Sequence, residues 1–194
     1  MPPKTMEEKT LIEQCIKNNR TAQHEMFKKI GGRFFAVLIR YVGNKDEAED
    51  LLQEGFFKLF NSLGNYKFEG SFEEWIRKIM VNTAIDYLKR KKDFVFSFSD
   101  LSEEEELVLK NSSEELTDLE QKYIRDIPPK KLFEIIEKLS PGYRVVFNLR
   151  AIEGYTHKEI AEKLNITEGT SKSNYSKARI RLKKYLNEYF SKRI

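Results

Sequence analysis

The chain has 194 residues, of which 40% are apolar and 34% are charged. This composition is too apolar for a disordered chain, and no apolar run approaches the ~18 residues that a membrane-spanning helix needs. The first residues lack the apolar segment of a signal peptide, and the single cysteine, Cys15, excludes an internal disulfide. We therefore expect a cytoplasmic protein without membrane insertion, with one large domain or two small ones.

The net charge of +4 is distributed unevenly along the chain. Residues 1–92 hold 17 basic and 13 acidic side chains, and residues 129–194 hold 15 and 7. Residues 93–128, between them, hold 3 basic and 11 acidic side chains. Two basic blocks around an acidic strip suggest two polyanion-binding modules on a tether.

Almost every periodic stretch of the first block predicts helix. We expect helices over 7–18, 21–42, 45–63 and 71–92, with a loop at "SLGNYKFEG", residues 62–70. Gly31-Gly32 marks a point where the second helix could bend or break. Asn44 with Glu47, and Ser71 with Glu74, have the spacing of capping boxes.

From residue 93 the helical pattern fails, so we expect a linker over 93–128 with short helices near 103–110 and 114–125. Four helices follow: 130–139, one capped by Ser140 with Pro141 at its first position, 156–164, and one from Thr167 to about Tyr189. No strand signal is present. The sequence predicts an all-α protein with domains at 1–92 and 129–194, the second a four-helix domain.

The segment "GYTHKEIAEKLNITEGTSKSNYSKARIRLKKYL", residues 154–186, has the arrangement of a helix-turn-helix. Its second helix begins with small and basic residues, which a recognition helix needs in the DNA major groove. With Tyr175, Ala178 and Leu182 as the buried stripe, we expect Ser173, Asn174, Ser176 and Lys177 to face outward. The candidate DNA-binding residues are Thr170, Lys172, Ser173, Asn174, Ser176, Lys177 and Arg179.

The helix at 45–63 predicts a different surface. Opposite its apolar residues it presents Asp46, Glu47, Asp50, Gln53, Glu54, Phe57 and Lys58. This face is acidic and is therefore a poor surface for DNA. An aromatic ring framed by acids suits a protein partner with basic helices. A solvated face with one exposed ring is the alternative that the pattern leaves open.

Three motifs in order make a resemblance visible: "DEAEDLLQEGFFKLF", then FxxWIxxIxxNxxIDYLKR, then "EGTSKSNYSKAR" after the acidic strip. Over about residues 8–187 the chain resembles the extracytoplasmic-function sigma factors of bacterial RNA polymerase. The resemblance implies a specificity subunit with no catalytic chemistry, cofactor or metal of its own. It implies core RNA polymerase, double-stranded and melted promoter DNA, and an anti-sigma factor as partners.

The resemblance also implies a role for each part of the chain. The helix at 45–63 would dock on the polymerase clamp helices through Asp50, Gln53 and Glu54, with Phe57 and Lys58 beside them. The C-terminal domain would read the −35 element, with Ser173, Ser176 and Lys177 at base-contact positions. The linker would thread toward the polymerase active site, although a merely soluble tether is equally open. Residues 64–92 would recognise and hold the −10 element, with candidates Tyr66, Lys67, Phe68, Ser71, Lys78, Asn82, Lys89 and Arg90.

The segment 71–92 combines aromatic rings with a basic end. Trp75 recurs on one helical stripe with Phe72, Ile76, Ile79, Thr83 and Tyr87, so we expect it in the core. Bases would then be captured by the preceding loop, residues 65–71.

The chain departs from the family pattern at four positions. Family members often have an aliphatic residue where this chain has Ser171, and an arginine where it has Asn174. Housekeeping sigma factors carry extra aromatic residues where this chain has Ser71 and Glu74.

Other classes of protein fit less well. His24 and His157 lie far apart without a ligand pattern, and no phosphate-binding glycine loop or nucleophile elbow is present, so we expect no enzyme. The runner-up is an operator-binding regulator with an N-terminal dimerisation or effector domain. The acidic face of helix 45–63 distinguishes the two, because it predicts polymerase binding without DNA. A membrane-surface role for 71–92 conflicts with the acidic helix beside it.

Overall fold

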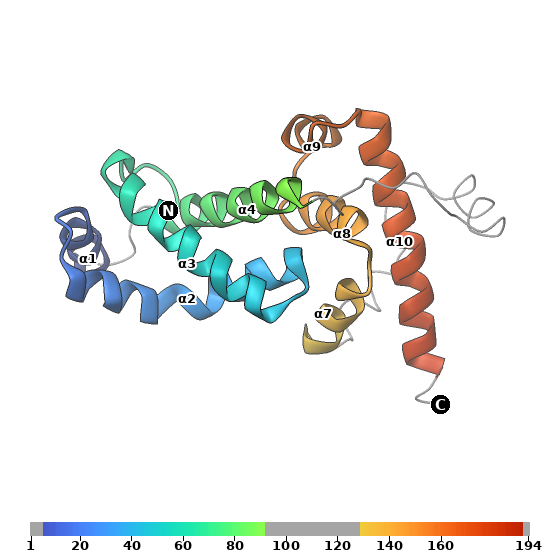
Figure 1. The fold of residues 1–194 in the computed structure, drawn as a ribbon, viewed down its shortest axis with the longest axis horizontal. Helices are drawn as coiled ribbons and strands as arrows, with labels where there is room; N and C mark the ends of the chain where they lie inside the picture. The colour runs from blue at the N-terminus through green and yellow to red at the C-terminus, as the bar shows by residue number, and fades with distance from the viewer. Residues whose placement is uncertain (1–5, 92–128, 192–194) are drawn as a thin grey trace. The chain divides into compact units, whose positions relative to one another are not determined.

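The computed structural model describes residues 6–91 and 129–191, and every regular element in these ranges is helical, as predicted (Figure 1). The chain divides into two compact units, Met1–Arg90 and Lys91–Ile194, and each is treated by itself. The predicted linker at 93–128, with its short helices, lies outside the described residues.

The first unit holds α1 (Met6–Ile16), α2 (Arg20–Val42), α3 (Lys45–Ser62), the 3₁₀ turn η1 (Leu63–Asn65) and α4 (Phe72–Arg90). Side-chain caps start the middle helices: Asn19 Oδ1 accepts from Thr21 N, and Asn44 Oδ1 accepts from Glu47 N, as its spacing predicted. The α2 helix runs through Gly31-Gly32 without a break, because both glycines keep helical geometry inside a well-packed helix.

Helices α2, α3 and α4 pack against one another, and α1 lies on α2. Their core contains Phe34, Leu38 and Tyr41 of α2, and Leu59 of α3, all 2% exposed or less. Helix α3 packs against α4 at Gly55, where the space that a Cβ would need is occupied by the buried side chain of Met80. The absence of a side chain at position 55 therefore leaves room for Met80 between the two helices.

The second unit holds α7 (Pro129–Glu137), α8 (Pro141–Phe147), a π-helical turn η2 (Asn148–Ile152), α9 (His157–Leu164) and α10 (Glu168–Ser191). Pro141 occupies the first turn of α8, as predicted, whereas the side chain of Ser140 makes no capping hydrogen bond to this helix. Helix α10 packs along α8 and α9, and its buried residues include Tyr175, Ala178, Leu182 and Leu186. The guanidinium of Arg144, 6% exposed, donates from Nη1 to Glu137 O at 2.9 Å and so connects α8 to the end of α7.

Candidate partner and nucleic-acid interfaces

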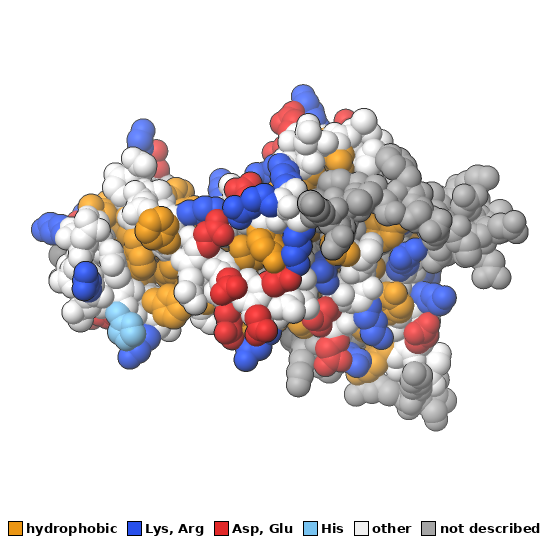
Figure 2. Space-filling model, viewed as in Figure 1, with side chains coloured by type: hydrophobic (Ala, Val, Ile, Leu, Met, Phe, Trp, Pro, Cys, Tyr) orange, Lys and Arg blue, Asp and Glu red, His pale blue; other side chains and the backbone are white. Residues whose placement is uncertain are grey.

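The predicted acidic face of α3 exists as one continuous surface. Asp50, Gln53 and Phe57 are exposed, and Glu54 and Lys58 are half-buried. They lie at positions i, i+3, i+4, i+7 and i+8, which share one side of a helix. Figure 2 shows acidic side chains gathered over this helix. Phe57 is 69% exposed, more than any other large apolar side chain of the described residues. Aromatic rings are enriched among the residues that carry binding energy at protein interfaces, so this ring is the candidate anchor of the face.

Glu54 connects this face to the end of α4. Its carboxylate lies 2.8 Å from Lys58 Nζ and 3.7 Å from Arg90 Nη2. The structure thus brings together two residues predicted for protein docking and one predicted for −10 DNA. The cation of Arg90 remains accessible, because its side chain is 66% exposed.

The loop after η1 corrects the prediction for Tyr66. Tyr66 is 5% exposed, and its ring centroid lies 5.0–5.2 Å from those of Phe68, Phe72 and Trp75. Its hydroxyl donates to Gly70 O at 3.3 Å. Burial and the nearby carboxylate of Glu8 raise the pKa of this hydroxyl above its usual value. Tyr66 is therefore the buried support of the loop, because apolar contacts close around its ring, and it presents no free face to a base.

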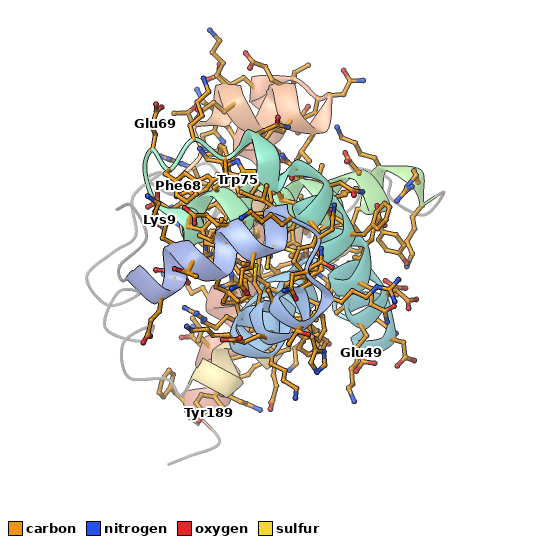
Figure 3. The ribbon with its side chains drawn as sticks, turned by 90° about the vertical axis from the view of Figure 1, so that its left-hand side faces the viewer. Lys9, Glu49, Phe68, Glu69, Trp75 and Tyr189 are labelled. Carbon is orange, nitrogen blue, oxygen red and sulfur yellow. The ribbon has the colours of Figure 1, made fainter. Side chains whose placement is uncertain are left out.

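The surface of the same cluster is formed by Phe68 and Trp75, which are half-buried. Phe68 has a positive φ of 58°, uncommon for a residue with a side chain. Lys9 of α1 holds its ammonium 5.7 Å from the centre of the Phe68 ring, and Figure 3 shows both side chains near Trp75. Trp75 is thus less buried than predicted, because it lies in the first turn of α4, where the apolar side of the helix reaches the surface beside the loop. Lys9 was missed because nothing in the sequence indicates that α1 reaches this loop.

The remaining −10 candidates lie on α4 and at its start. Lys78, Asn82 and Lys89 are exposed on one side of the helix, and Lys67 is exposed in the loop. Ser71 is half-buried, and its Oγ accepts from Glu74 N at 3.3 Å, so it caps α4 as its spacing predicted. The accessible cations therefore follow α4 from the loop to its C-terminus.

The helix-turn-helix of the second unit forms as predicted. Thr156 and Glu159 make a reciprocal capping box at the start of α9. Asn165 ends α9 in the left-handed conformation, with φ 55°, and Thr167 Oγ1 accepts from Thr170 N at 3.0 Å at the start of α10. The hydrogen bonds of Thr156 hold the pKa of the Glu159 carboxyl below its usual value.

The outward face predicted for α10 is partly wrong. Of the four residues predicted to face outward, Asn174 and Lys177 are only 4% and 7% exposed, and the further candidate Arg179 is 9% exposed. The buried stripe is wider than Tyr175, Ala178 and Leu182: it includes Ser171, and it takes in Asn174 on its flank. Arg179 lies beside the stripe, with its guanidinium carbon 6.0 Å from the centre of the Tyr175 ring.

Lys177 lies on the opposite side of the helix from Tyr175, about 200° around the axis, and is also buried. The other four candidates keep access to solvent. Lys172 is exposed, and Thr170, Ser173 and Ser176 are half-buried. The accessible candidates are therefore concentrated in the first turns of α10.

His157 and Ser171 were not predicted as site residues. The His157 Nδ1 and Ser171 Oγ atoms lie 2.9 Å apart in a buried contact between α9 and α10. The sequence contains no signal for this pair, because the two residues are 14 positions apart and only the packing of the two helices brings them together.

Comparison with known proteins agrees with this architecture. The family model for sigma-70 region 2 matches residues 26–94, and the model for sigma-70 region 4 matches residues 130–182. Among curated proteins, the chain is 25% identical over 186 residues to the RNA polymerase sigma-H factor of Pseudomonas aeruginosa, covering 93% of this chain and 94% of that protein. It is 26% identical to the ECF RNA polymerase sigma factor SigW of Bacillus subtilis, covering 93% and 97%.

Other similarities are more partial or more distant. The chain is 30% identical over 167 residues to the ECF RNA polymerase sigma factor SigE of Mycolicibacterium smegmatis, covering 86% of this chain and 62% of that protein. Among solved structures, it matches CnrH in complex with the cytosolic domain of CnrY at 19% identity and a TM-score of 0.44, covering 92% of this chain and 96% of that one.

Regions 2 and 4 in this order define a specificity subunit of bacterial transcription. The chain belongs to the sigma-70 family of RNA polymerase sigma factors, with relatives in its extracytoplasmic-function (ECF) group. Its function is to direct promoter-specific transcription. Within 6–91 and 129–191, no helix is long and apolar enough to cross a membrane.

Proposed function

We propose that the exposed face of α3, with Asp50, Gln53, Glu54, Phe57 and Lys58, is the surface that docks on the clamp helices of core polymerase. The observation that carries this proposal is the 69% exposure of Phe57 between acidic residues. A free protein gains nothing from an exposed ring, whereas a basic helical partner can bury the ring and pair with the acids around it.

The docking proposal is tested by combining Asp50→Ala, Gln53→Ala and Phe57→Ala in the full chain. The substituted side chains are exposed, so the fold should persist. We expect loss of binding to purified core polymerase without DNA. The matched control is Lys45→Ala on the same helix, about 80° around the axis from Gln53, the nearest residue of this face; Lys45 is exposed and paired with Glu49. Unchanged core binding by the triple variant would exclude this face.

The proposed promoter contacts are the candidate residues whose side chains are accessible to solvent. For the −10 element we propose Lys67, Phe68, Lys78, Asn82, Lys89 and Arg90, with Phe68 as the ring offered to an unpaired base. For the −35 element we propose Thr170, Lys172, Ser173 and Ser176 in the first turns of α10. The proposed contacts leave out Tyr66, Asn174, Lys177 and Arg179, because the free chain buries each of these side chains to 9% exposure or less.

The promoter roles are tested by transcription in vitro with purified core polymerase. Core polymerase reconstituted with this chain should start transcription at a defined set of sites on genomic templates, and core polymerase alone should not. Mapped start sites should share sequence elements near −10 and −35. Start sites without shared elements would contradict the assignment of both interfaces.

Family members are specificity subunits, and we propose that this chain likewise leaves bond formation to the core enzyme. A cytoplasmic location follows from that partnership. The anti-sigma factor implied by the resemblance stays a prediction, which copurification of the tagged chain from cells of its source would test.

A further inference from the structure

Two buried polar side chains connect the two helices of the helix-turn-helix. His157 is the first residue of α9, and Ser171 lies in the first turn of α10. Their Nδ1 and Oγ atoms are 2.9 Å apart, and the two residues are 7% and 0% exposed. A hydrogen bond is directional and short-ranged, whereas apolar contacts tolerate sliding and rotation. This bond therefore selects one axial position and one rotation of α10 relative to α9.

Each end of the contact is itself held in place. His157 follows Thr156, whose N donates to the Glu159 carboxylate at 2.8 Å within the capping box. Ser171 N donates to Thr167 O at 3.0 Å, and the cap of Thr167 fixes the same turn. Both helix starts are thus fixed by local hydrogen bonds, so the bond between His157 and Ser171 couples the position of α10 to that of α9.

Aromatic packing supports the same pair. The imidazole of His157 meets the Tyr175 ring edge-on, with centroids 5.6 Å apart, and Tyr175 in turn stacks on Phe147 at 6.0 Å. The ring of His157 therefore has a packing role that a phenyl ring could replace and a hydrogen-bonding role that it could not. The two roles can be separated by substitution.

We propose that His157 and Ser171 are positioning residues for promoter recognition: their bond sets how α10 presents its first turns to the DNA. Neither residue needs to touch DNA. Ser171 lies between Thr170 and Lys172, two of the accessible −35 candidates, so a shift of this turn displaces both. The inference rests on the proposed −35 role of α10 and adds the device that orients it.

The test uses polymerase holoenzyme containing the full chain. The probes are two duplexes: the strongest promoter found by start-site mapping, and the same duplex with its −35 segment scrambled. The ratio of the two affinities measures −35 preference. A wild-type ratio near one would remove the proposed −35 role and this inference with it; a high wild-type ratio allows the pair to be tested separately.

Ser171→Ala and His157→Phe should each lower the preference about tenfold, in line with loss of one buried hydrogen bond. Affinity for the scrambled duplex should stay unchanged, since it depends on phosphate contacts and on the −10 element, which the His157–Ser171 pair does not position. His157→Asn should retain the preference, because its amide offers a donor or an acceptor near the position of Nδ1. An unchanged preference in both single variants would overturn the proposal, as would a loss in His157→Asn equal to that in His157→Phe.

The double variant His157→Phe with Ser171→Ala separates orientation from stability. It removes both polar groups, so neither remains buried without a partner, and we expect its melting temperature to recover relative to Ser171→Ala. The preference should remain low, because no directional contact replaces the lost bond. Recovery of the preference together with the melting temperature would show a merely structural role and overturn the proposal.

Discussion

The guanidinium of Arg90, the last residue of α4, lies against the carboxylate of Glu54 on α3, with Nη2 and Oε2 3.7 Å apart. The other carboxylate oxygen of Glu54 is 2.8 Å from Lys58 Nζ. Glu54 is a proposed polymerase contact and Arg90 a proposed DNA contact. The two proposed interfaces of the first unit therefore meet at one ion pair.

This ion pair should matter more for function than for stability. Its side chains are 66% and 35% exposed, so Arg90→Ala should change the free energy of unfolding by less than about 1 kcal/mol. The variant holoenzyme should bind a −10 non-template strand more weakly, while its affinity for core polymerase stays close to wild type. Urea unfolding and fluorescence binding measure these quantities, with Lys45→Ala on α3 as a control cation. Equal losses in core and DNA binding would argue against separate roles.

Tyr66 and Phe68 should respond in opposite ways. Tyr66→Ala empties a buried site among three rings and should cost about 3–5 kcal/mol of unfolding free energy. Tyr66→Phe loses only the hydroxyl bond to Gly70 and should cost about 1 kcal/mol, with promoter opening preserved. Phe68→Ala should strongly reduce promoter opening, as measured by the permanganate reactivity of unpaired thymines, and should change the free energy of unfolding only slightly. A strong opening defect in Tyr66→Phe would restore Tyr66 as a direct base contact.

Gly55 should be intolerant of even one added methyl group. Gly55→Ala places a Cβ into the side chain of Met80, which is fully buried, and should destabilise the first unit by about 1–3 kcal/mol. Gly32→Ala is the matched control: it also lies inside a helix, but no atom lies within 4 Å of its new Cβ. That control should stabilise by roughly 0.5–1 kcal/mol. Thermal unfolding of both variants decides the point, and equal effects would contradict the close approach of α3 to α4.

The capping box of α9 predicts a pH dependence. Hydrogen bonds from Thr156 lower the pKa of Glu159 in the folded state below its ordinary value of 4.5. The carboxylate therefore contributes stability that is complete above about pH 4.5 and is lost as the pH falls through the lowered pKa. Glu159→Gln keeps the capping geometry but cannot titrate, so its melting temperature should fall less between pH 6 and pH 3. Identical pH profiles for the two proteins would show that the box contributes no linked protonation.

Much of the fold was predictable because the deciding information is local. Period-3.6 patterns gave every described helix, and Asn44, Ser71, Thr156 and Thr167 mark helix starts that the structure has. The acidic face of α3 followed from spacing along one helix. Where a helix face meets only solvent, its composition suffices to describe it.

The errors fall where two or more segments meet. Tyr66 has no periodic neighbours, so its sequence position suggested a free loop residue, whereas three rings from the loop and α4 close around it. Asn174 was assigned outward from one stripe, but the packing of α10 against α8 and α9 buries a wider sector. Burial of a side chain depends on how many elements converge on it, which a single helix pattern does not encode.

The sequence by itself determined the helices, the caps at Asn44, Ser71, Thr156 and Thr167, the charge blocks and the motifs of regions 2 and 4, because each depends on residues close together in the chain. The tertiary structure alone decided that Met80 fills the space beside Gly55, that Arg90 meets Glu54, and that His157 bonds to Ser171. These contacts join residues 14 to 36 positions apart, and only packing in three dimensions brings their atoms within reach.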